Sequence, residues 1–276
     1  MKKFVSVILA AALLLMCSVC FAEGETVLRA GTNPEFAPFE YVGDSGEVEG
    51  IDVDIINEIA KDLGVTITME PMDFDALVPS LVSGKLDIAI AGMTITDERK
   101  QSVLFSDPYF NATQVVILPE NSEIATQDDL KGKRIGVQMG TTGDLLVSEE
   151  SFGAGEVSRY NKGMDAALDL VNGRLDAVVI DTLPAKQFVA SLTGLVVRED
   201  ILVDVEVESY GIAVQLGQEE LIAKINASLA RMMEDGTYDA ILVKYVADDE
   251  VVEGEGETAE DATAEDATTE DATTEN

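Results

Sequence analysis

The chain has 276 residues, with 53 aspartates and glutamates, 18 lysines and arginines and no histidine, and its formal net charge is −35. This acidity excludes a nucleic-acid partner and a basic membrane-binding surface, because both require clustered cations. Without histidine, the common zinc sites and a histidine base are also excluded. Hydrophobic residues make up 46% of the chain, enough for buried cores, and the length favours two lobes.

Residues 1–22 have the pattern of an export signal. Two lysines begin it, an apolar run follows over residues 4–16, and Cys20-Phe21-Ala22 forms a small-x-small cleavage site. Both cysteines of the chain lie within this segment, so the mature protein would hold no disulfide. We therefore predict a periplasmic or other extracytoplasmic protein, cleaved after Ala22. A membrane-tethered form, with residues 4–22 retained as an anchor or a lipid on Cys17 or Cys20, is the less favoured alternative.

The middle of the chain alternates strand and helix patterns. Apolar runs predict strands at residues 27–30, 65–69, 86–91, 115–118, 134–138, 177–180 and 210–215. Helical periodicity and caps predict helices at residues 52–63, 74–82, 128–130, from about 144, 164–171, 183–192, 219–234 and 238–246. Repeated strand–helix–strand units predict an α/β protein with mostly parallel sheets flanked by helices.

One stretch of the sequence occurs twice in similar form. Residues 83–91 read Ser-Gly-Lys-Leu-Asp-Ile-Ala-Ile-Ala, and residues 172–180 read Asn-Gly-Arg-Leu-Asp-Ala-Val-Val-Ile. Each copy ends near a polar residue, Thr94 or Asp181, where the carboxyl edge of a sheet would face a crevice. Open α/β sheets bind ligands at such edges, so we expect two similar lobes with a site between them.

The C-terminal segment, residues 248–276, is of low complexity. It holds thirteen acids and no base, and Glu-Asp-Ala-Thr recurs every five residues, a period of neither helix nor strand. Because no large apolar side chain follows Val252, burial of apolar surface cannot offset the conformational entropy that the segment would lose on becoming ordered. We predict a disordered acidic tail, and a role in cation binding or wall spacing is the less favoured alternative.

Several collinear motifs resemble the polar amino-acid-binding proteins of ABC importers, bacterial solute-binding protein family 3. They are Phe36-Ala-Pro-Phe39, Gly50 to Leu63, Pro71-Met-Asp-Phe74, Ala91 to Lys100, Phe105 to Tyr109, Gly140-Thr-Thr142 and Ile180-Asp-Thr182. The resemblance covers about residues 27–247 and is nearest to the glutamine-binding periplasmic proteins. It implies a two-lobed periplasmic-binding-protein fold, each lobe a mostly parallel sheet with helices, and two crossing strands as the hinge.

In this resemblance the second lobe is inserted in the first. The crossings are expected near residues 109–113 and 207–210. Lobe 1 would consist of residues 23–110 and 211–247, and lobe 2 of residues 111–210. The expected partners are an amino-acid ligand and the membrane permease of an ABC importer, with no cofactor, and the protein is expected to be a monomer.

The resemblance also assigns anchors for the ligand's charged groups. Arg99 would bind the carboxylate, since a guanidinium makes two parallel charge-assisted bonds that lysine cannot make. Backbone N–H groups of Thr94 and of Gly140, Thr141 and Thr142 would add to it at a helix start. Taken without the motif, Arg99 is equally well a surface arginine paired with a neighbouring acid.

Asp181 is the candidate partner of the ligand's ammonium. The Gly92 carbonyl and the Thr94 hydroxyl would complete its acceptors, because three N–H donors need three partners. An aspartate directly after a strand is also a common helix N-cap, so a capping role stays open.

Phe36 and Phe74 resemble the aromatic pair that encloses the ligand's aliphatic stem, although phenylalanines of this kind are also ordinary core residues. The specificity positions depart from the glutamine binders. Asn33 stands at an acidic position, Gln138 at a lysine position, Ile180 at a histidine position and Thr142 at a glycine position. We therefore expect a neutral, amide-rich pocket for a polar, uncharged side chain. A cationic ligand is second choice, since it needs Glu35 or Asp73 to turn inward.

The function expected from the sequence is capture of an amino acid and its delivery to a permease. No nucleophile or general base is assembled by the motifs, so we expect no catalytic residue, no metal and no enzymatic activity. The alternative is an enzyme on the same scaffold, similar to the cyclohexadienyl dehydratases, with Glu35 or Asp73 as the acid.

Overall fold

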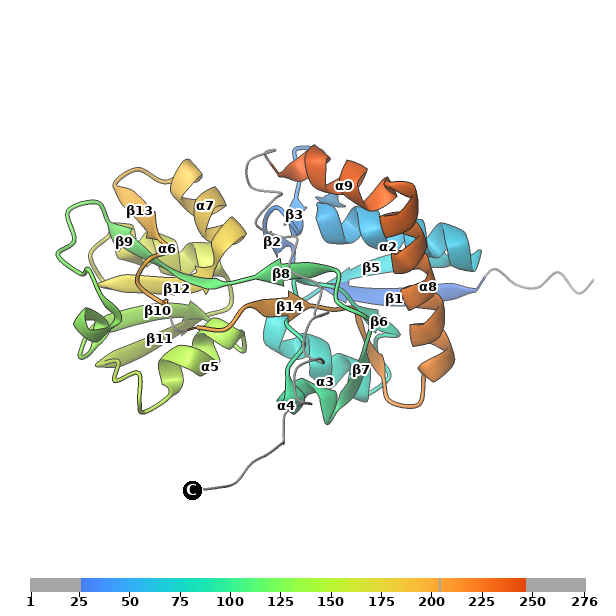
Figure 1. Cartoon of the computed structure of the whole chain (residues 1–276), viewed down its shortest axis with the longest axis horizontal. Coiled ribbons are helices and arrows are strands. Elements are labelled where there is room, and N and C mark those ends of the chain that lie inside the picture. Colours follow the sequence, from blue (N-terminus) through green and yellow to red (C-terminus); the bar gives the residue numbers. More distant parts are fainter. Residues whose placement is uncertain (1–25, 204, 247–276) are drawn as a thin grey trace, which may run out of the picture.

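The computed structural model describes residues 26–203 and 205–246. The predicted export signal at 1–22 and the predicted acidic tail at 248–276 lie outside these residues. Figure 1 shows two α/β lobes side by side, joined by two extended segments that run between them. Among the described helices, none has the length and apolar character needed to cross a bilayer.

Lobe 1 is built on a five-stranded sheet of order β5-β1-β6-β15-β7. Strand β1 pairs in parallel with β5 and β6, whereas β15 is antiparallel to β6 and β7. The strands are β1 (Val27–Thr32), β5 (Thr66–Pro71), β6 (Ile88–Ala89), β7 (Val103–Phe105) and β15 (Ala213–Gln215).

The helices of lobe 1 cover both faces of this sheet. One group packs together on one face and comprises α2 (Ile51–Leu63), α8 (Glu219–Asp235) and α9 (Thr237–Tyr245). The other face carries η1 (Phe74–Ala76), α3 (Leu77–Val82) and, near β7, α4 (Asp97–Lys100). Around β6 the side chains alternate: Ile88 and Ile90 join the core under α2 and α8, and Ala89 and Ala91 join the core under α3.

Lobe 2 repeats this plan with the order β11-β10-β12-β9-β13. Strand β10 is parallel to β11 and β12, and β9 is antiparallel to β12 and β13. The strands are β9 (Gln114–Pro119), β10 (Arg134–Gln138), β11 (Glu156–Tyr160), β12 (Ala177–Asp181) and β13 (Leu195–Arg198), and the helices are η2 (Gln127–Leu130), α5 (Thr142–Ser148), α6 (Gly163–Val171) and α7 (Thr182–Ser191).

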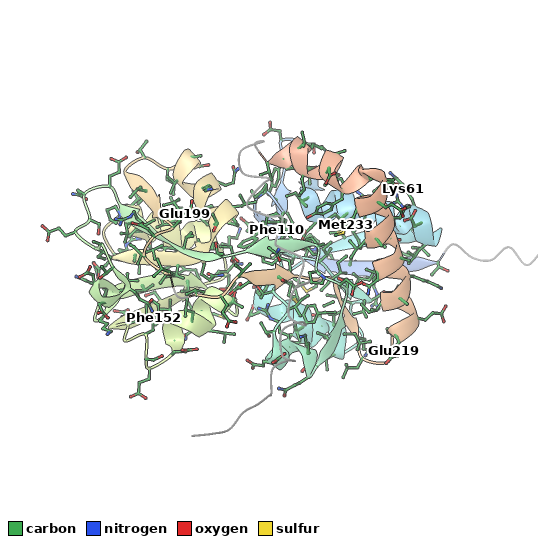
Figure 2. The ribbon with its side chains drawn as sticks, in the orientation of Figure 1. Lys61, Phe110, Phe152, Glu199, Glu219 and Met233 are labelled. Carbon is green, nitrogen blue, oxygen red and sulfur yellow. The ribbon has the colours of Figure 1, made fainter. Side chains whose placement is uncertain are left out.

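The connection between the lobes is a pair of antiparallel strands. Strand β8 (Phe110–Ala112) pairs with β14 (Glu208–Tyr210), at the two places where crossings are expected from the sequence. Phe110 lies at this junction, as Figure 2 shows, with its ring edge-on to Phe39 at 4.8 Å between centroids. The expected lobe limits at 110/111 and 210/211 fall in or beside these strands, and as domain limits they stay a prediction. A small sheet of β2 (Glu35–Phe36), β3 (Glu40–Val42) and β4 (Val48–Glu49) completes lobe 1.

The repeated sequence motif corresponds to a repeated ion pair. In lobe 1 the Arg29 backbone N–H and guanidinium both donate to Asp87, whose two side-chain oxygens are engaged at 2.8–3.0 Å. In lobe 2 Arg134 and Asp176 form the same arrangement at 2.7–3.1 Å. Each aspartate is the Asp of the Leu-Asp pair in one repeat. The ion pair therefore joins the beginnings of two neighbouring parallel strands, β1 and β6 in lobe 1 and β10 and β12 in lobe 2.

The two-lobed α/β fold is confirmed, but several details differ from the sequence-based expectation. The expected strand at 86–91 is reduced to β6, the expected helix at 128–130 is the 3₁₀ turn η2, and β11 was not expected. The sheets are mixed rather than mostly parallel, because β15 and β9 follow the crossing segments and enter antiparallel. The expected helix at 74–82 begins as a 3₁₀ turn. The expected strand at 210–215 is divided between β14 and β15 at Gly211, where a Cβ would come within 2.8 Å of the Ile95 side chain.

Candidate functional site

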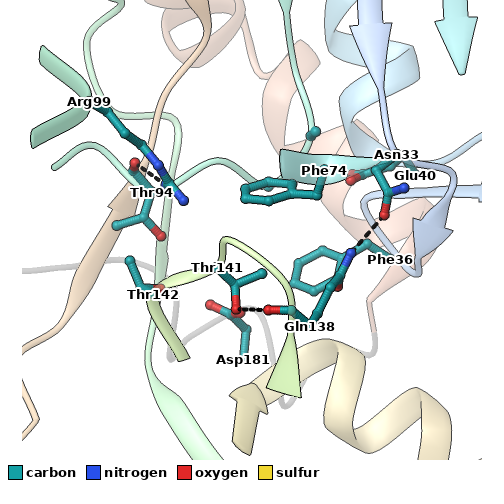
Figure 3. A pocket seen from close by; sticks show the side chains of 12 residues that line it. Asn33, Phe36, Glu40, Phe74, Thr94, Arg99, Gln138, Thr141, Thr142 and Asp181 are labelled. Carbon is teal, nitrogen blue, oxygen red and sulfur yellow. Dashed lines mark hydrogen bonds between the residues drawn. The ribbon is translucent and has the colours of Figure 1, made fainter. Parts of the chain in front are cut away.

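Residues of both lobes line a common pocket. Ten of the eleven residues expected from the sequence line it, together with two that were not expected, Glu40 and Ala91. Figure 3 shows their side chains converging on this space. The expected residues in the lining are Asn33, Phe36, Phe74, Gly92, Thr94, Arg99, Gln138, Thr141, Thr142 and Asp181.

These residues meet because strands of both sheets end there. Asn33 follows β1, Gly92 and Thr94 follow β6, and Gln138 and Asp181 end β10 and β12. Parallel strands present their carboxyl ends at one edge, and the two sheets turn these edges toward each other. The pocket therefore occupies the position at which open α/β sheets bind ligands.

Arg99 on α4 connects the lobes at the pocket. Its Nη1 donates to the Thr94 carbonyl at 2.6 Å and its Nη2 donates to the Gly140 carbonyl at 3.0 Å. The guanidinium carbon lies 5.2 Å from the centroid of the Phe74 ring, within cation–π range. Burial lowers the pKa of Arg99, while Glu208 and Asp181 act in the opposite direction. Arg99 is therefore not a surface arginine paired with a helix neighbour, and a guanidinium carries several N–H donors beyond these two.

Asp181 provides a buried carboxylate on the lobe 2 side. It stands at the N-cap position of α7, yet its side chain makes no capping hydrogen bond. Instead, Oδ1 accepts from Gln114 Nε2 at 3.0 Å, a neighbour in the antiparallel register of β9 and β12. Burial, and then the nearby Glu208 carboxylate, raise the pKa of Asp181 to about 7. Because burial disfavours its charged form, the Asp181 carboxylate would be stabilised by a nearby cation, such as the ammonium of a ligand.

The aromatic walls come from Phe36 and Phe74, which are 5% and 9% exposed. Gly92 allows Phe36 to come close: a Cβ at Gly92 would lie 2.9 Å from the ring, and its φ of 49° is in the left-handed region. The Gly92 N–H donates to Asp52 Oδ2 at 2.8 Å, which fixes the backbone of the segment.

One end of the pocket is an amide pair from the two lobes. Gln138 Nε2 donates to Asn33 Oδ1 at 2.9 Å and to the Asn161 carbonyl at 3.3 Å. The Asn33 amide nitrogen in turn donates to the Met72 carbonyl at 2.8 Å. Among the described residues, the buried Gln138 Oε1 has no hydrogen-bond partner. Both N–H groups of the Gln138 amide are thus occupied within the protein, and the atom of this amide left without a partner is an acceptor.

Glu40 is a pocket residue that sequence reasoning missed. It is fully buried beside Asp52, and burial followed by the charge of Asp52 raises the pKa of Glu40 well above its usual range. Asp52 accepts from the Tyr109 hydroxyl and from the Gly92 N–H, both at 2.8 Å, and burial raises its pKa to about 6. A glutamate in the short strand after Phe39 reads as a solvent-facing residue, so no signal in the sequence marks it.

Gly140 is the expected site residue that does not line the pocket. Its N–H donates to Asp144 Oδ2 at 3.1 Å, so this amide is not directed to an anion, contrary to the expectation. Thr141 caps α5 by accepting from the Asp144 N–H at 3.2 Å, and its hydroxyl donates to the Gln138 carbonyl at 2.8 Å. The contribution of Gly140 is its carbonyl, which holds Arg99.

The acids Glu35 and Asp73 do not turn into the pocket. Glu35 pairs with Lys162 at 2.5 Å, and Asp73 accepts from the Asn161 amide at 3.0 Å. Both contacts join lobe 1 to lobe 2 at the edge of the site. In the part of the chain that the structure describes, no cluster of His, Cys, Asp or Glu side chains is arranged to hold a metal ion.

Comparison with known proteins places this architecture among binding proteins. Residues 28–248 match the model of the bacterial extracellular solute-binding proteins, family 3. A probable histidine-binding protein of Neisseria gonorrhoeae is 38% identical over 90% of this chain and 97% of its own length. The L-arginine-binding protein of Pseudomonas aeruginosa is 36% identical over 90% and 98%, respectively.

Solved structures agree with this relationship. An ancestral arginine-binding protein bound to glutamine superposes with a TM-score of 0.76 and 42% identity, covering 81% of this chain and 99% of the other. These relatives are named for histidine and arginine, so a particular nearness to glutamine-binding proteins is not shown. From the match over nearly all described residues, the chain belongs to the bacterial extracellular solute-binding proteins of family 3.

Proposed function

We propose that the protein captures one L-amino acid outside the cytoplasm and presents it, enclosed between the lobes, to the permease of an ABC importer. The observation that carries this proposal is the pairing of a guanidinium and a buried carboxylate in one pocket, Arg99 and Asp181, beside two phenylalanine walls. An amino acid has the complementary carboxylate, ammonium and aliphatic stem. A buried site must satisfy each of these charges.

The amide pair restricts the ligand's side chain. Gln138 uses both N–H groups of its amide within the protein, and its buried Oε1 has no partner among the described residues, so we infer that Oε1 accepts a hydrogen bond from the ligand's side chain. Side chains ending in N–H groups, such as glutamine, arginine and histidine, meet this requirement, and aspartate and glutamate do not. A neutral side chain such as that of glutamine meets it without a charged partner, in agreement with the sequence-based preference. The names of the relatives, for arginine and histidine, favour a cationic side chain, although neither Glu35 nor Asp73 turns inward to pair with one.

The alternative of a cyclohexadienyl-dehydratase-like enzyme has one supporting observation. The precursor of such an enzyme, an ancestral amino-acid-binding protein, superposes at a TM-score of 0.72 and 35% identity. The two acids considered for this chemistry, Glu35 and Asp73, are bound to Lys162 and Asn161 and do not line the pocket. Capture without transformation is therefore the function we propose.

Native mass spectrometry of freshly purified protein tests the proposal directly. We expect a complex of one protein with one amino acid, whose mass identifies the residue and whose side chain contains an N–H group. A bound molecule that is not an amino acid, or aspartate or glutamate as the bound residue, would overturn the proposal.

A further inference from the structure

Glu208 was not expected from the sequence and does not line the pocket, yet it contacts two side chains that do. Its Oε2 accepts from the Thr94 hydroxyl at 2.9 Å and from the Thr142 hydroxyl at 2.6 Å. Gln114 Nε2 lies 3.3 Å from the same oxygen and 3.0 Å from Asp181 Oδ1. One carboxylate oxygen in hinge strand β14 thus gathers donors from residues of both lobes.

The direction of these hydrogen bonds follows from the donor inventory. A hydroxyl has a single hydrogen and two lone pairs, and an ionised carboxylate can only accept. The hydrogen of Thr94 is therefore directed to Glu208, and the lone pairs of Thr94 Oγ1 are free for another donor. In the absence of a carboxylate behind it, the hydroxyl can rotate and present its hydrogen to the pocket, where it would repel an ammonium.

We propose that Glu208 is a positioning residue for the ligand's α-ammonium: it fixes the Thr94 hydroxyl as an acceptor, which then shares the ammonium with Asp181. The inference rests on the proposed function, since it needs an amino acid in the pocket. It adds to the expected acceptors of the ammonium a residue that does not line the pocket and acts from the hinge through Thr94.

Backbone hydrogen bonds within lobe 1 and the hinge keep Glu208 beside the Thr94 hydroxyl. The Ile95 N–H donates to the Ser209 carbonyl at 2.8 Å, and the Gly211 N–H donates to the Met93 carbonyl at 3.0 Å. These bonds hold β14 beside the Thr94 segment. The Thr94–Glu208 pair is thus preformed, and a preformed acceptor does not have to be reoriented when the ligand binds. The Thr142 hydroxyl and Gln114 reach the same carboxylate from the lobe 2 side.

The test is a cycle that combines one protein change with one ligand change. Glu208→Gln keeps the shape of the side chain and removes the charge, and the ligand is compared with its des-amino analogue, in which hydrogen replaces the α-ammonium. Titrations at about pH 8 keep Asp181 ionised in both proteins, because its pKa is about 7. We expect Glu208→Gln to weaken the amino acid about tenfold and the des-amino analogue less than about twofold. Equal weakening of both ligands, or no weakening of either, would overturn the inference.

Two further variants separate this role from general damage. Glu206→Gln makes the same charge change at an exposed position of the same segment, and we expect both affinities to remain as in the wild type. Thr94→Val removes the hydroxyl, and in that background Glu208→Gln should have almost no additional effect on the amino acid. If the two effects are instead additive, Glu208 does not act through Thr94. If the wild type binds no amino acid at all, the proposed function fails, and this outcome differs from an additive cycle.

Discussion

Gln138 Nε2 donates to Asn33 Oδ1 at 2.9 Å, joining the end of β10 in lobe 2 to the segment after β1 in lobe 1. These side chains are 105 residues apart in the sequence, and they form one end of the ligand pocket. The bond therefore joins the two lobes at the pocket, and the buried Gln138 Oε1 has no hydrogen-bond partner among the described residues.

Replacing Gln138 should change the ranking of ligands more than their general affinity. Gln138→Ala removes the acceptor for the side chain but leaves Arg99 and Asp181 in place. We expect a loss of about 1–2 kcal/mol for the preferred amino acid and little change for weak ligands. Calorimetric titrations with neutral, basic and acidic amino acids measure this. A uniform loss across the panel, as expected from the lost Asn33 bond between the lobes alone, would contradict the assignment.

Replacing Arg99 should weaken the binding of all amino acids by a similar factor and leave their ranking unchanged. Arg99→Lys keeps the charge but loses the planar fork and the stacking on Phe74. One oxygen of the ligand carboxylate would be left poorly paired in a desolvated site, which costs about 2–4 kcal/mol, or about 30- to 1000-fold in Kd, for every amino acid. A changed ranking with intact overall affinity would show that Arg99 is not the carboxylate anchor.

The pKa of Asp181, about 7, predicts a pH-dependent affinity. The ammonium binds the charged form, so a protonated Asp181 must lose its proton when the ligand enters. Affinity should rise about tenfold between about pH 6 and pH 8, and Asp181→Asn should remove most of both the affinity and the slope. Titrations near pH 7 in two buffers of different ionisation enthalpy report the released proton directly. Equal heats in the two buffers would exclude this linkage.

The same carboxylate should destabilise the ligand-free protein. Because its pKa in the folded state is raised above the usual value of 3.8, the folded state loses stability as the pH rises from about 4 to above 7. Asp181→Asn should therefore raise the free energy of unfolding by about 2–4 kcal/mol at about pH 8 and by little below about pH 4. Denaturant unfolding across this range measures the difference, with Glu206→Gln as the exposed control. A variant less stable than the wild type at about pH 8 would contradict this view of Asp181.

Much of the site could be predicted because its residues lie in contiguous motifs at the ends of predictable strands. Phe36, Phe74, Arg99 and Asp181 each belong to such a motif, and all of them line the pocket. Their ligand-binding roles stay predictions until a ligand is bound.

The missed residues have no local signal. Glu208 is 114 residues from Thr94 and 66 from Thr142. It meets Thr94 because backbone hydrogen bonds hold β14 beside the Thr94 segment, and it meets Thr142 across the two lobes. Gln114 reaches Asp181 through the register of β9 and β12, which the sequence does not specify. Similarly, the short strands β2, β3, β4, β7 and β13 have between two and four residues, too few for a period-two pattern to be recognised.

The most direct measurement of the central claim is calorimetric titration of protein that has been unfolded, freed of ligand by dialysis and refolded. Each common amino acid is added to the wild type and to Arg99→Lys. We expect saturable one-to-one binding of at least one amino acid whose side chain ends in N–H groups, no binding of aspartate or glutamate, and loss of binding strength for all ligands in Arg99→Lys. Refolded protein that binds no amino acid, or that binds glutamate most tightly, would contradict the account.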